Sequence, residues 1–106
     1  MTVDESFEAM QKVFNPSAAA NLNKTIQWNI SGEQAGSWAI KIENQTCQLI
    51  KGSADKADLT LSMSDQTWLD IAEGRLDAMK AFLSGKVKTA GDVMLATRLS
   101  QVFPRK

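Results

Sequence analysis

Strict alternation of large apolar and polar or small residues in three separate segments is the feature that most constrains how this chain folds. In residues 25–31, 37–43 and 58–64, every second residue is large and apolar. Successive side chains of a strand point to opposite faces, so each segment predicts a strand with one buried and one hydrated face. The large residues are Ile26, Trp28, Ile30, Trp38, Ile40, Ile42, Leu59, Leu61 and Met63.

Turns and two weaker strands complete a predicted sheet. Residues 32–36 read as a hairpin turn in which Gly32 and Gly36 are free to take positive φ, and Asn44-Gln45 reads as a second tight turn. Residues 46–52 predict a strand with less regular alternation, and residues 86–89 predict a short fifth strand. Close turns favour antiparallel pairing, so we expect a mostly antiparallel sheet of five strands.

Four helical segments show apolar residues at helical spacing. Thr2 and Glu5 have the spacing of a capping box, and Asn15-Pro16 is expected to end the first helix. Ser64 and Asp77 are expected to cap the next two helices. The last helix is expected to end at Pro104. The apolar sides comprise Val3, Phe7, Met10 and Phe14; then Trp68, Leu69, Ile71 and Ala72; then Met79, Phe82 and Leu83; and finally Leu95, Ala96, Leu99, Val102 and Phe103.

These elements fit together in one way. A sheet with one apolar face and several amphipathic helices, each needing a partner, predicts an α+β fold of two layers with the helices covering one face. The length of 106 residues predicts a single domain over residues 1–106.

Composition narrows the classes of function. The 12 basic and 12 acidic residues cancel, and this argues against a nucleic-acid partner. The single Cys47 excludes an internal disulfide and favours a cytoplasmic location, and the N-terminus has no signal-peptide pattern. No segment approaches the ~20 apolar residues of a membrane span. The C-terminal sequence VFPRK does not match the Ser-Lys-Leu peroxisomal address.

A longer motif is similar to a known family. Residues 57–99, ADLTLSMSDQTWLDIAEGRLDAMKAFLSGKVKTAGDVMLATRL, resemble the sterol carrier protein 2 (SCP2) sterol-binding domain family. The resemblance lies in the strand end at 58–64, Asp65-x-x-Trp68, the M-K-A-F-x-S-G-K-x-K string and the Gly-Asp at 91–92. Ala78 stands where family members often have Pro. The absence of a peroxisomal tail favours a stand-alone prokaryotic protein.

The resemblance implies a site rather than a reaction. It implies a hydrophobic tunnel between sheet and helices that holds a fatty acid, an acyl chain or a sterol-like lipid, with no cofactor. Met63, Met79 and Met94 suit such a site, because Met adapts to ligands of varied shape. Arg98 and Gln101 are candidates for orienting a polar head, with Lys86 and Lys88 as weaker ones. The expected wall comprises Trp38, Leu61, Met63, Trp68, Ile71, Met79, Phe82, Leu83, Met94, Leu95, Leu99 and Phe103.

Catalysis, metal binding and a scaffold role are the alternatives to a lipid carrier. The sequence has no His, which excludes Ser–His and Cys–His nucleophilic pairs. Asp65, Asp70, Glu73 and Asp77 match no known cation-binding loop, and no metal is expected. The main alternative is a non-catalytic accessory or scaffold protein on the same fold, for example in prenyl-quinone biosynthesis. Transient membrane contact, a homodimer and an enzyme partner are further expectations.

Overall fold

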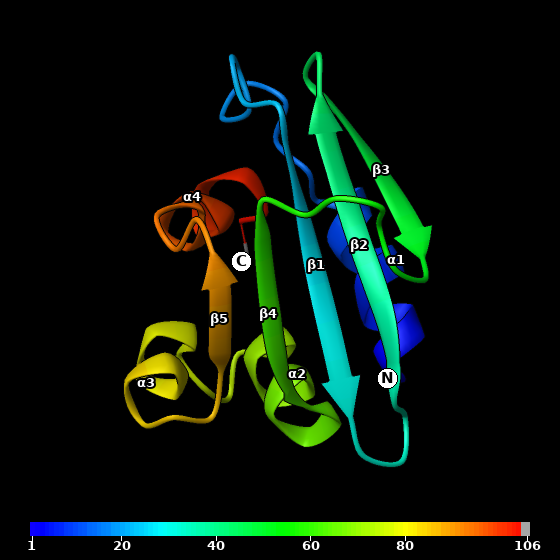
Figure 1. Ribbon diagram of the computed structural model, residues 1–106, viewed down its shortest axis with the longest axis vertical. Helices are drawn as coiled ribbons and strands as arrows, with labels where there is room; N and C mark the ends of the chain where they lie inside the picture. The colour runs from blue at the N-terminus through cyan, green and yellow to red at the C-terminus, as the bar shows by residue number, and fades with distance from the viewer. Residues whose placement is uncertain (105–106) are drawn as a thin grey trace.

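A five-stranded mixed sheet forms one layer of the molecule, and helices form the other (Figure 1). The computed structural model describes residues 1–104. Within that range the sheet has the order β3-β2-β1-β4-β5. The strands are β1 Lys24–Ser31, β2 Gly36–Glu43, β3 Thr46–Lys51, β4 Leu59–Ser64 and β5 Lys88–Gly91, and the helices are α1 Val3–Lys12, α2 Asp65–Ala72, α3 Ala78–Leu83 and α4 Leu95–Val102.

The predicted α+β architecture and mostly antiparallel sheet are confirmed. β1 pairs with β2, β2 with β3 and β4 with β5 in antiparallel fashion, whereas β1 and β4 run parallel at the centre of the sheet. Trp28 lies opposite Trp38 on one side and Leu61 on the other, so all three side chains share one face. The alternating residues of the three best-patterned strands therefore form one continuous apolar surface.

The helices cover this apolar face, and the opposite face stays largely open (Figure 1). Ile26, Ile40 and Ile42 have no exposed surface beneath the helix layer. The connection from β3 to β4 crosses the other face, as Figure 1 shows. It explains a buried polar residue there, because the Gln27 side-chain oxygen accepts a 2.8 Å hydrogen bond from the Ala54 amide.

Helix starts match their predicted caps. Thr2 and Glu5 form a complete capping box, the Ser64 side chain caps α2, and Asp77 accepts from the amides of Met79 and Lys80. The first helix ends at Lys12 rather than at Asn15. Phe14 consequently lies outside the helix, where it packs against Phe103 with ring centroids 5.7 Å apart.

Two further local predictions differ from the structure. Gly32 has a φ of 106°, but Gly36 begins β2 without a positive φ, because the hairpin needs only one such residue there. The fifth strand is Lys88–Gly91, two residues later than predicted. The reason is that the Lys86 amide donates to the Ala81 carbonyl, which keeps residues 86–87 in the turn that closes α3. The Asn44-Gln45 turn is confirmed, with φ of 52° and 59°.

Candidate functional site

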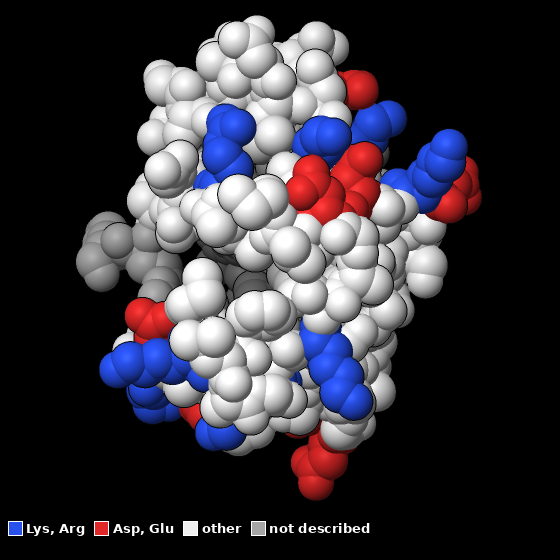
Figure 2. Space-filling view, turned by 60° about the vertical axis from the view of Figure 1, so that its left-hand side comes forward, with Lys and Arg blue, Asp and Glu red and all other residues white. Residues whose placement is uncertain are grey.

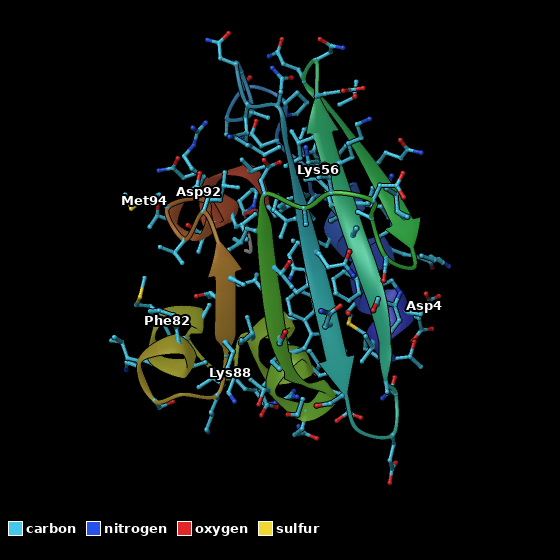
Figure 3. All side chains as sticks on the ribbon, in the orientation of Figure 1. Asp4, Lys56, Phe82, Lys88, Asp92 and Met94 are labelled. Atoms are coloured by element: carbon cyan, nitrogen blue, oxygen red, sulfur yellow. The ribbon has the colours of Figure 1, made fainter. Side chains whose placement is uncertain are left out.

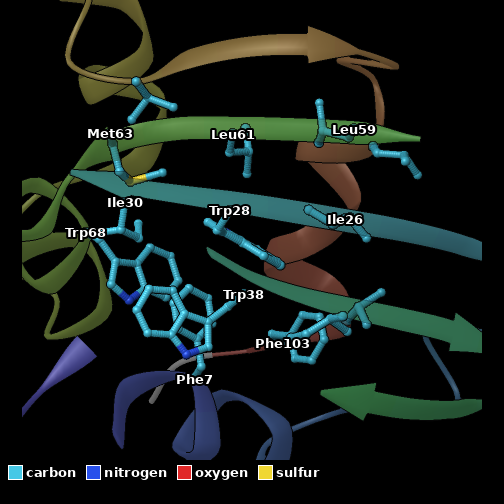
Figure 4. Packing of buried hydrophobic residues seen from close by; sticks show 14 of the residues in the cluster. Phe7, Ile26, Trp28, Ile30, Trp38, Leu59, Leu61, Met63, Trp68 and Phe103 are labelled. Atoms are coloured by element: carbon cyan, nitrogen blue, oxygen red, sulfur yellow. The ribbon is translucent and has the colours of Figure 1, made fainter. Parts of the chain in front are cut away.

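An aromatic cluster closes one end of the space between sheet and helices. The ring of Phe7 stacks between Trp38 and Trp68, with centroids 5.1 Å and 4.6 Å away, and meets Trp28 edge-on at 5.4 Å (Figure 4). All four side chains are buried. Trp38 and Trp68, two of the predicted wall residues, thus lie in a closely packed part of the core.

Hydrogen bonds fix this cluster in place. The Trp68 indole N–H donates to Ser6 Oγ at 2.6 Å, and the Trp38 indole N–H donates to Asp4 Oδ1 at 3.1 Å. Lys51 forms ion pairs with Asp4 and Glu8 at 3.0 Å and 2.8 Å. The Trp38 N–H and the Lys51 ammonium hold the pKa of the Asp4 carboxyl below its ordinary value. These bonds join α1 to α2, β2 and β3.

A second group of predicted wall residues comes from β4, from α4 and its C-terminal end, and from α2. Leu61, Met63, Leu95 and Phe103 are buried, each with less than a tenth of its surface exposed. Ile71 and Leu99 are half-buried and pack against the same core. Thr89 of β5 lies opposite Leu61 and so shares its face. Val87, which the sequence reasoning missed, is buried just before β5.

The third group of predicted wall residues is exposed, contrary to their assignment to buried helix sides. Leu83 is 75% exposed, Met79 51% and Phe82 42%, whereas the small Ala81 is fully buried. Residues four apart share one side of a helix, so Met79 and Leu83 point away from the side on which Ala81 packs. The six-residue α3 therefore contacts the fold through its smallest apolar residue and presents its largest ones outward.

The same edge of the molecule carries further exposed apolar residues at the start of α4. Met94 is 69% exposed and Val93 47%. Figure 3 shows Phe82 and Met94 projecting beyond β5 on the same side, one near each end of the strand. The sequence reasoning missed Val93, although the apolar pair Val93-Met94 directly after Gly91-Asp92 was a usable signal.

The surface is hollowed between these two sets of residues. Figure 2 brings the β5 edge forward and shows a hollow at the height between α4 and α3, surrounded mostly by uncharged side chains. Leu61 of β4 and Thr89 of β5 lie opposite each other in the strand pair at this edge, and both side chains point to the inner face of the sheet. Exposed apolar side chains close to a buried apolar core make this edge of the molecule suited to contact with an apolar molecule. The enclosed tunnel that the family resemblance implied stays a prediction.

A hollow of about 350 Å³ with both polar and apolar lining residues lies at the other side of α4. Arg98 contributes to its wall, and its guanidinium donates a 3.1 Å hydrogen bond to the Ala18 carbonyl. Gln101 is exposed and is not among its lining residues. Of the two main head-group candidates, Arg98 lines this hollow and Gln101 does not. The lining residues are Asn21, Leu22, Lys24, Asp92, Met94, Leu95, Thr97 and Arg98.

The Cys47 thiol is partly buried, and the four acidic residues considered as cation ligands have structural partners. Burial raises the pKa of the Cys47 thiol to about 11, so it is protonated and unreactive at neutral pH. Asp70 and Glu73 pair with Arg75, Asp77 caps α3, and Asp65 accepts from backbone amides. In the described part of the chain, no group of three or more potential ligands could hold a metal ion. Within residues 1–104, no helix is both long and apolar enough to cross a bilayer.

The two-layer fold and its exposed apolar edge are features expected of a lipid-binding domain. Comparison with known families agrees: the chain belongs to the SCP-2 sterol transfer family, whose model matches residues 7–104. It is 31% identical over 102 residues to hydroxysteroid dehydrogenase-like protein 2 of Xenopus laevis, which covers 95% of this chain and 24% of that protein. It is 32% identical over 84 residues to mouse peroxisomal multifunctional enzyme type 2, covering 76% of this chain and 11% of that enzyme. The chain thus spans a quarter or less of these relatives.

Solved structures show the same fold. The solution structure of palmitated SCP2L2 from Aedes aegypti superimposes with a TM-score of 0.81 at 21% identity, covering 99% of this chain and 96% of that one. The apo sterol carrier protein 2 of Yarrowia lipolytica gives 0.68 at 20% identity, covering 93% and 90%. The sec-alkylsulfatase Pisa1 from Pseudomonas sp. gives 0.85 at 23% identity, covering 100% of this chain but 17% of the enzyme. Family and fold together support a lipid-binding or sterol-carrier role.

Proposed function

We propose that this protein is a non-enzymatic lipid carrier that holds a fatty acid, an acyl chain or a sterol-like lipid at the β5 edge, between α3, α4 and the inner face of β4. The observation that carries the proposal is the exposure of large apolar side chains on α3 and just before α4, at the edge of a sheet whose inner face is buried and apolar. Membership of the SCP-2 sterol transfer family supports the class of ligand.

The energetics suit a long apolar chain. Each methylene removed from water contributes about 0.8 kcal/mol. About ten buried methylenes therefore contribute roughly 8 kcal/mol, and the further apolar carbons of a long chain offset part of the cost of association. An affinity near micromolar needs about 8 kcal/mol of net binding free energy, so binding in this range does not require a specific polar contact.

A substitution that enlarges a side chain at the proposed lipid site tests where the ligand binds. Leu99→Trp on α4 enlarges a half-buried side chain that packs against the core, and should weaken binding of a fluorescent fatty acid at least tenfold. Ser100→Trp on the exposed side of the same helix is the matched control and should bind as the unmodified chain does. Near-equal melting temperatures of the two variants would show that both fold.

The ligand class is tested by native mass spectrometry of gently purified protein, with extraction of whatever is bound. A mass increment matching a fatty acid or another lipid is expected. A bare mass that persists after incubation with fatty acids, acyl-CoA and sterols would overturn the proposal.

The exposed apolar residues of α3 also favour a second candidate, a non-catalytic accessory protein that presents this surface to an enzyme partner. Large exposed apolar patches mark protein-binding surfaces as well as ligand sites. An example is a protein that assists prenyl-quinone biosynthesis without binding free fatty acid. Weak fatty-acid binding together with co-purification of a biosynthetic enzyme would favour this second function.

A further inference from the structure

The methionines of this chain differ widely in exposure. Among the five, Met94 is 69% exposed and Met79 51%, whereas Met63 is 7% exposed. Met1 is 63% exposed at the N-terminus, and Met10 is partly buried against the core. Figure 3 shows Met94 projecting beyond β5. Two of the three most exposed thioethers therefore lie at the edge of the molecule where the proposed lipid site is located.

The other side chains that an oxidant could modify are better shielded. Burial raises the pKa of the Cys47 thiol to about 11, so little of the reactive thiolate is present at neutral pH. The indoles of Trp28, Trp38 and Trp68 are buried in the aromatic cluster. The exposed thioethers are therefore the groups that an oxidant in solution meets first.

We propose that Met79 and Met94 are a pair of oxidation sites through which hydrogen peroxide lowers the affinity of the protein for its lipid. Peroxide transfers one oxygen atom to each thioether sulfur. The O–O bond breaks, a sulfur–oxygen bond forms, and the hydrogen on the transferred oxygen passes to the departing oxygen. The sulfur is oxidised to a sulfoxide and the peroxide is reduced to water. Sulfoxide reductases reverse the modification.

Oxidation replaces an apolar group with a polar one at the surface that the lipid would contact. A thioether is apolar and adapts to ligands of varied shape, whereas a sulfoxide accepts hydrogen bonds from water. An acyl chain that covers the sulfoxide removes this water and offers no donor in return. Leaving two such groups without a partner should weaken fatty-acid binding about tenfold. This effect on affinity rests on the proposed carrier function.

The modification should leave the fold intact. Ala81 is the residue of α3 that is buried, and Met79 points away from the side on which it packs. Met94 precedes α4, where Leu95 is the first buried residue. Neither Met79 nor Met94 belongs to the buried core. A lower affinity after oxidation would therefore report a change at the site rather than unfolding.

The experiment treats the full chain with hydrogen peroxide, maps the sulfoxides by mass spectrometry of peptides and measures binding of a fluorescent fatty acid. Met79 and Met94 should be oxidised faster than Met63, and the affinity should fall about tenfold. In the double variant Met79→Leu with Met94→Leu, peroxide should leave the affinity at its starting value for that variant. In Met79→Gln with Met94→Gln, the polar amides should weaken binding without peroxide.

A matched control places an oxidisable side chain away from the site. Val13 is 44% exposed at the end of α1, which contacts β3, and β3 and β5 form opposite edges of the sheet. Val13→Met, added to the leucine double variant, should be oxidised by peroxide. Its affinity for the fatty acid should not change on oxidation.

Three results would each overturn the proposal. They are an equal loss of affinity in the unmodified chain and the leucine double variant, an unchanged affinity in a chain that carries both sulfoxides, and faster oxidation of Met63 than of Met79 and Met94. The order of oxidation is measured without ligand and tests the two sites by themselves. Absence of fatty-acid binding before oxidation would instead overturn the carrier function, and with it the effect of oxidation on affinity.

Discussion

At the scale of single residues, Phe7 is the side chain on which the closed end of the core depends. Its ring fills the space between two indoles and touches a third. The sequence identified Phe7 only as one of four apolar residues on the first helix. The structure adds that Phe7 joins the helix layer to the sheet, because Trp28 and Trp38 belong to β1 and β2.

Replacing Phe7 with Ala should therefore destabilise the fold by about 3–5 kcal/mol, the usual cost of removing a buried aromatic ring. Urea unfolding followed by tryptophan fluorescence measures the change. Phe82→Ala is the matched control and should cost clearly less than the change at Phe7, since Phe82 is 42% exposed whereas Phe7 is fully buried. Equal losses in both variants would contradict the packing described here.

Arg98 is the residue at which the polar head of a ligand is best tested. Its guanidinium donates one hydrogen bond to Ala18 and borders the hollow beside Leu22 and Lys24. Arg98→Met should weaken binding of a fatty acid about five- to tenfold, because a partly hydrated charge-assisted hydrogen bond is lost. Binding of the corresponding fatty alcohol should change little. An equal effect on acid and alcohol would assign Arg98 a structural role only.

At the scale of elements, α1 is held to the sheet by a polar contact that titrates. Asp4 accepts from Trp38 and pairs with Lys51, and both interactions keep the pKa of its carboxyl lowered in the folded state. A carboxyl with a lowered folded pKa contributes stability above its unfolded pKa and loses it as the pH falls through the folded value. For Asp4 this loss begins near its ordinary value of 3.8 and continues below it.

The free energy of unfolding should accordingly fall as the pH drops below about 4, and part of this fall should be absent in Asp4→Asn. Urea titrations at a series of pH values measure both slopes. Because Asp4 lies at the surface, the difference should be modest. Identical pH dependence in the two proteins would show that the contact with Trp38 and Lys51 does not persist in solution.

The helices α1 and α2 bury large aromatic side chains, whereas α3 buries only a small one. α1 and α2 meet the sheet through Phe7 and Trp68, whereas α3 meets the fold through Ala81. A helix with little buried apolar surface opens locally at low free energy. The loosely held α3 borders the proposed lipid site, where movement would let a ligand enter.

At the scale of the whole molecule, this division predicts where a ligand changes the dynamics. Hydrogen exchange of backbone amides in α3 and in the first turn of α4 should be fast without lipid and several-fold slower with bound fatty acid. Amides of β1 and β2 should be protected in both states, because they lie at the centre of the sheet. Protection that rises only in β1 and β2 would contradict a site at the β5 edge.

The strand order of the sheet also determines which residues that are far apart in the sequence become neighbours in space. The parallel pairing of β1 with β4 brings Trp28 beside Leu61, and the β5 edge brings Phe82 and Met94 to one side of the molecule. Neither neighbourhood can be inferred from turn lengths, because the 52–58 connection is compatible with several strand orders. A likeness to SCP2 structures was needed to expect this topology from the sequence.

The sequence by itself determined the features that depend on short-range chemistry. The alternation in 25–31, 37–43 and 58–64 correctly assigned the buried face of three strands, and the caps at Thr2, Ser64 and Asp77 correctly placed three helix starts. These follow from the periods of strand and helix and from hydrogen bonds between residues two or three apart. The motif in 57–99 correctly indicated the family.

Only the tertiary structure determined which other element, if any, covers the apolar side of each helix and strand. Trp38 and Trp68 close around Phe7, while Met79, Phe82 and Leu83, equally apolar by sequence, remain exposed beyond the edge of the sheet. The physical reason is that periodicity records which side of an element is apolar but not whether another element covers that side. Coverage depends on packing between segments far apart in the chain, and at the β5 edge no described element covers α3.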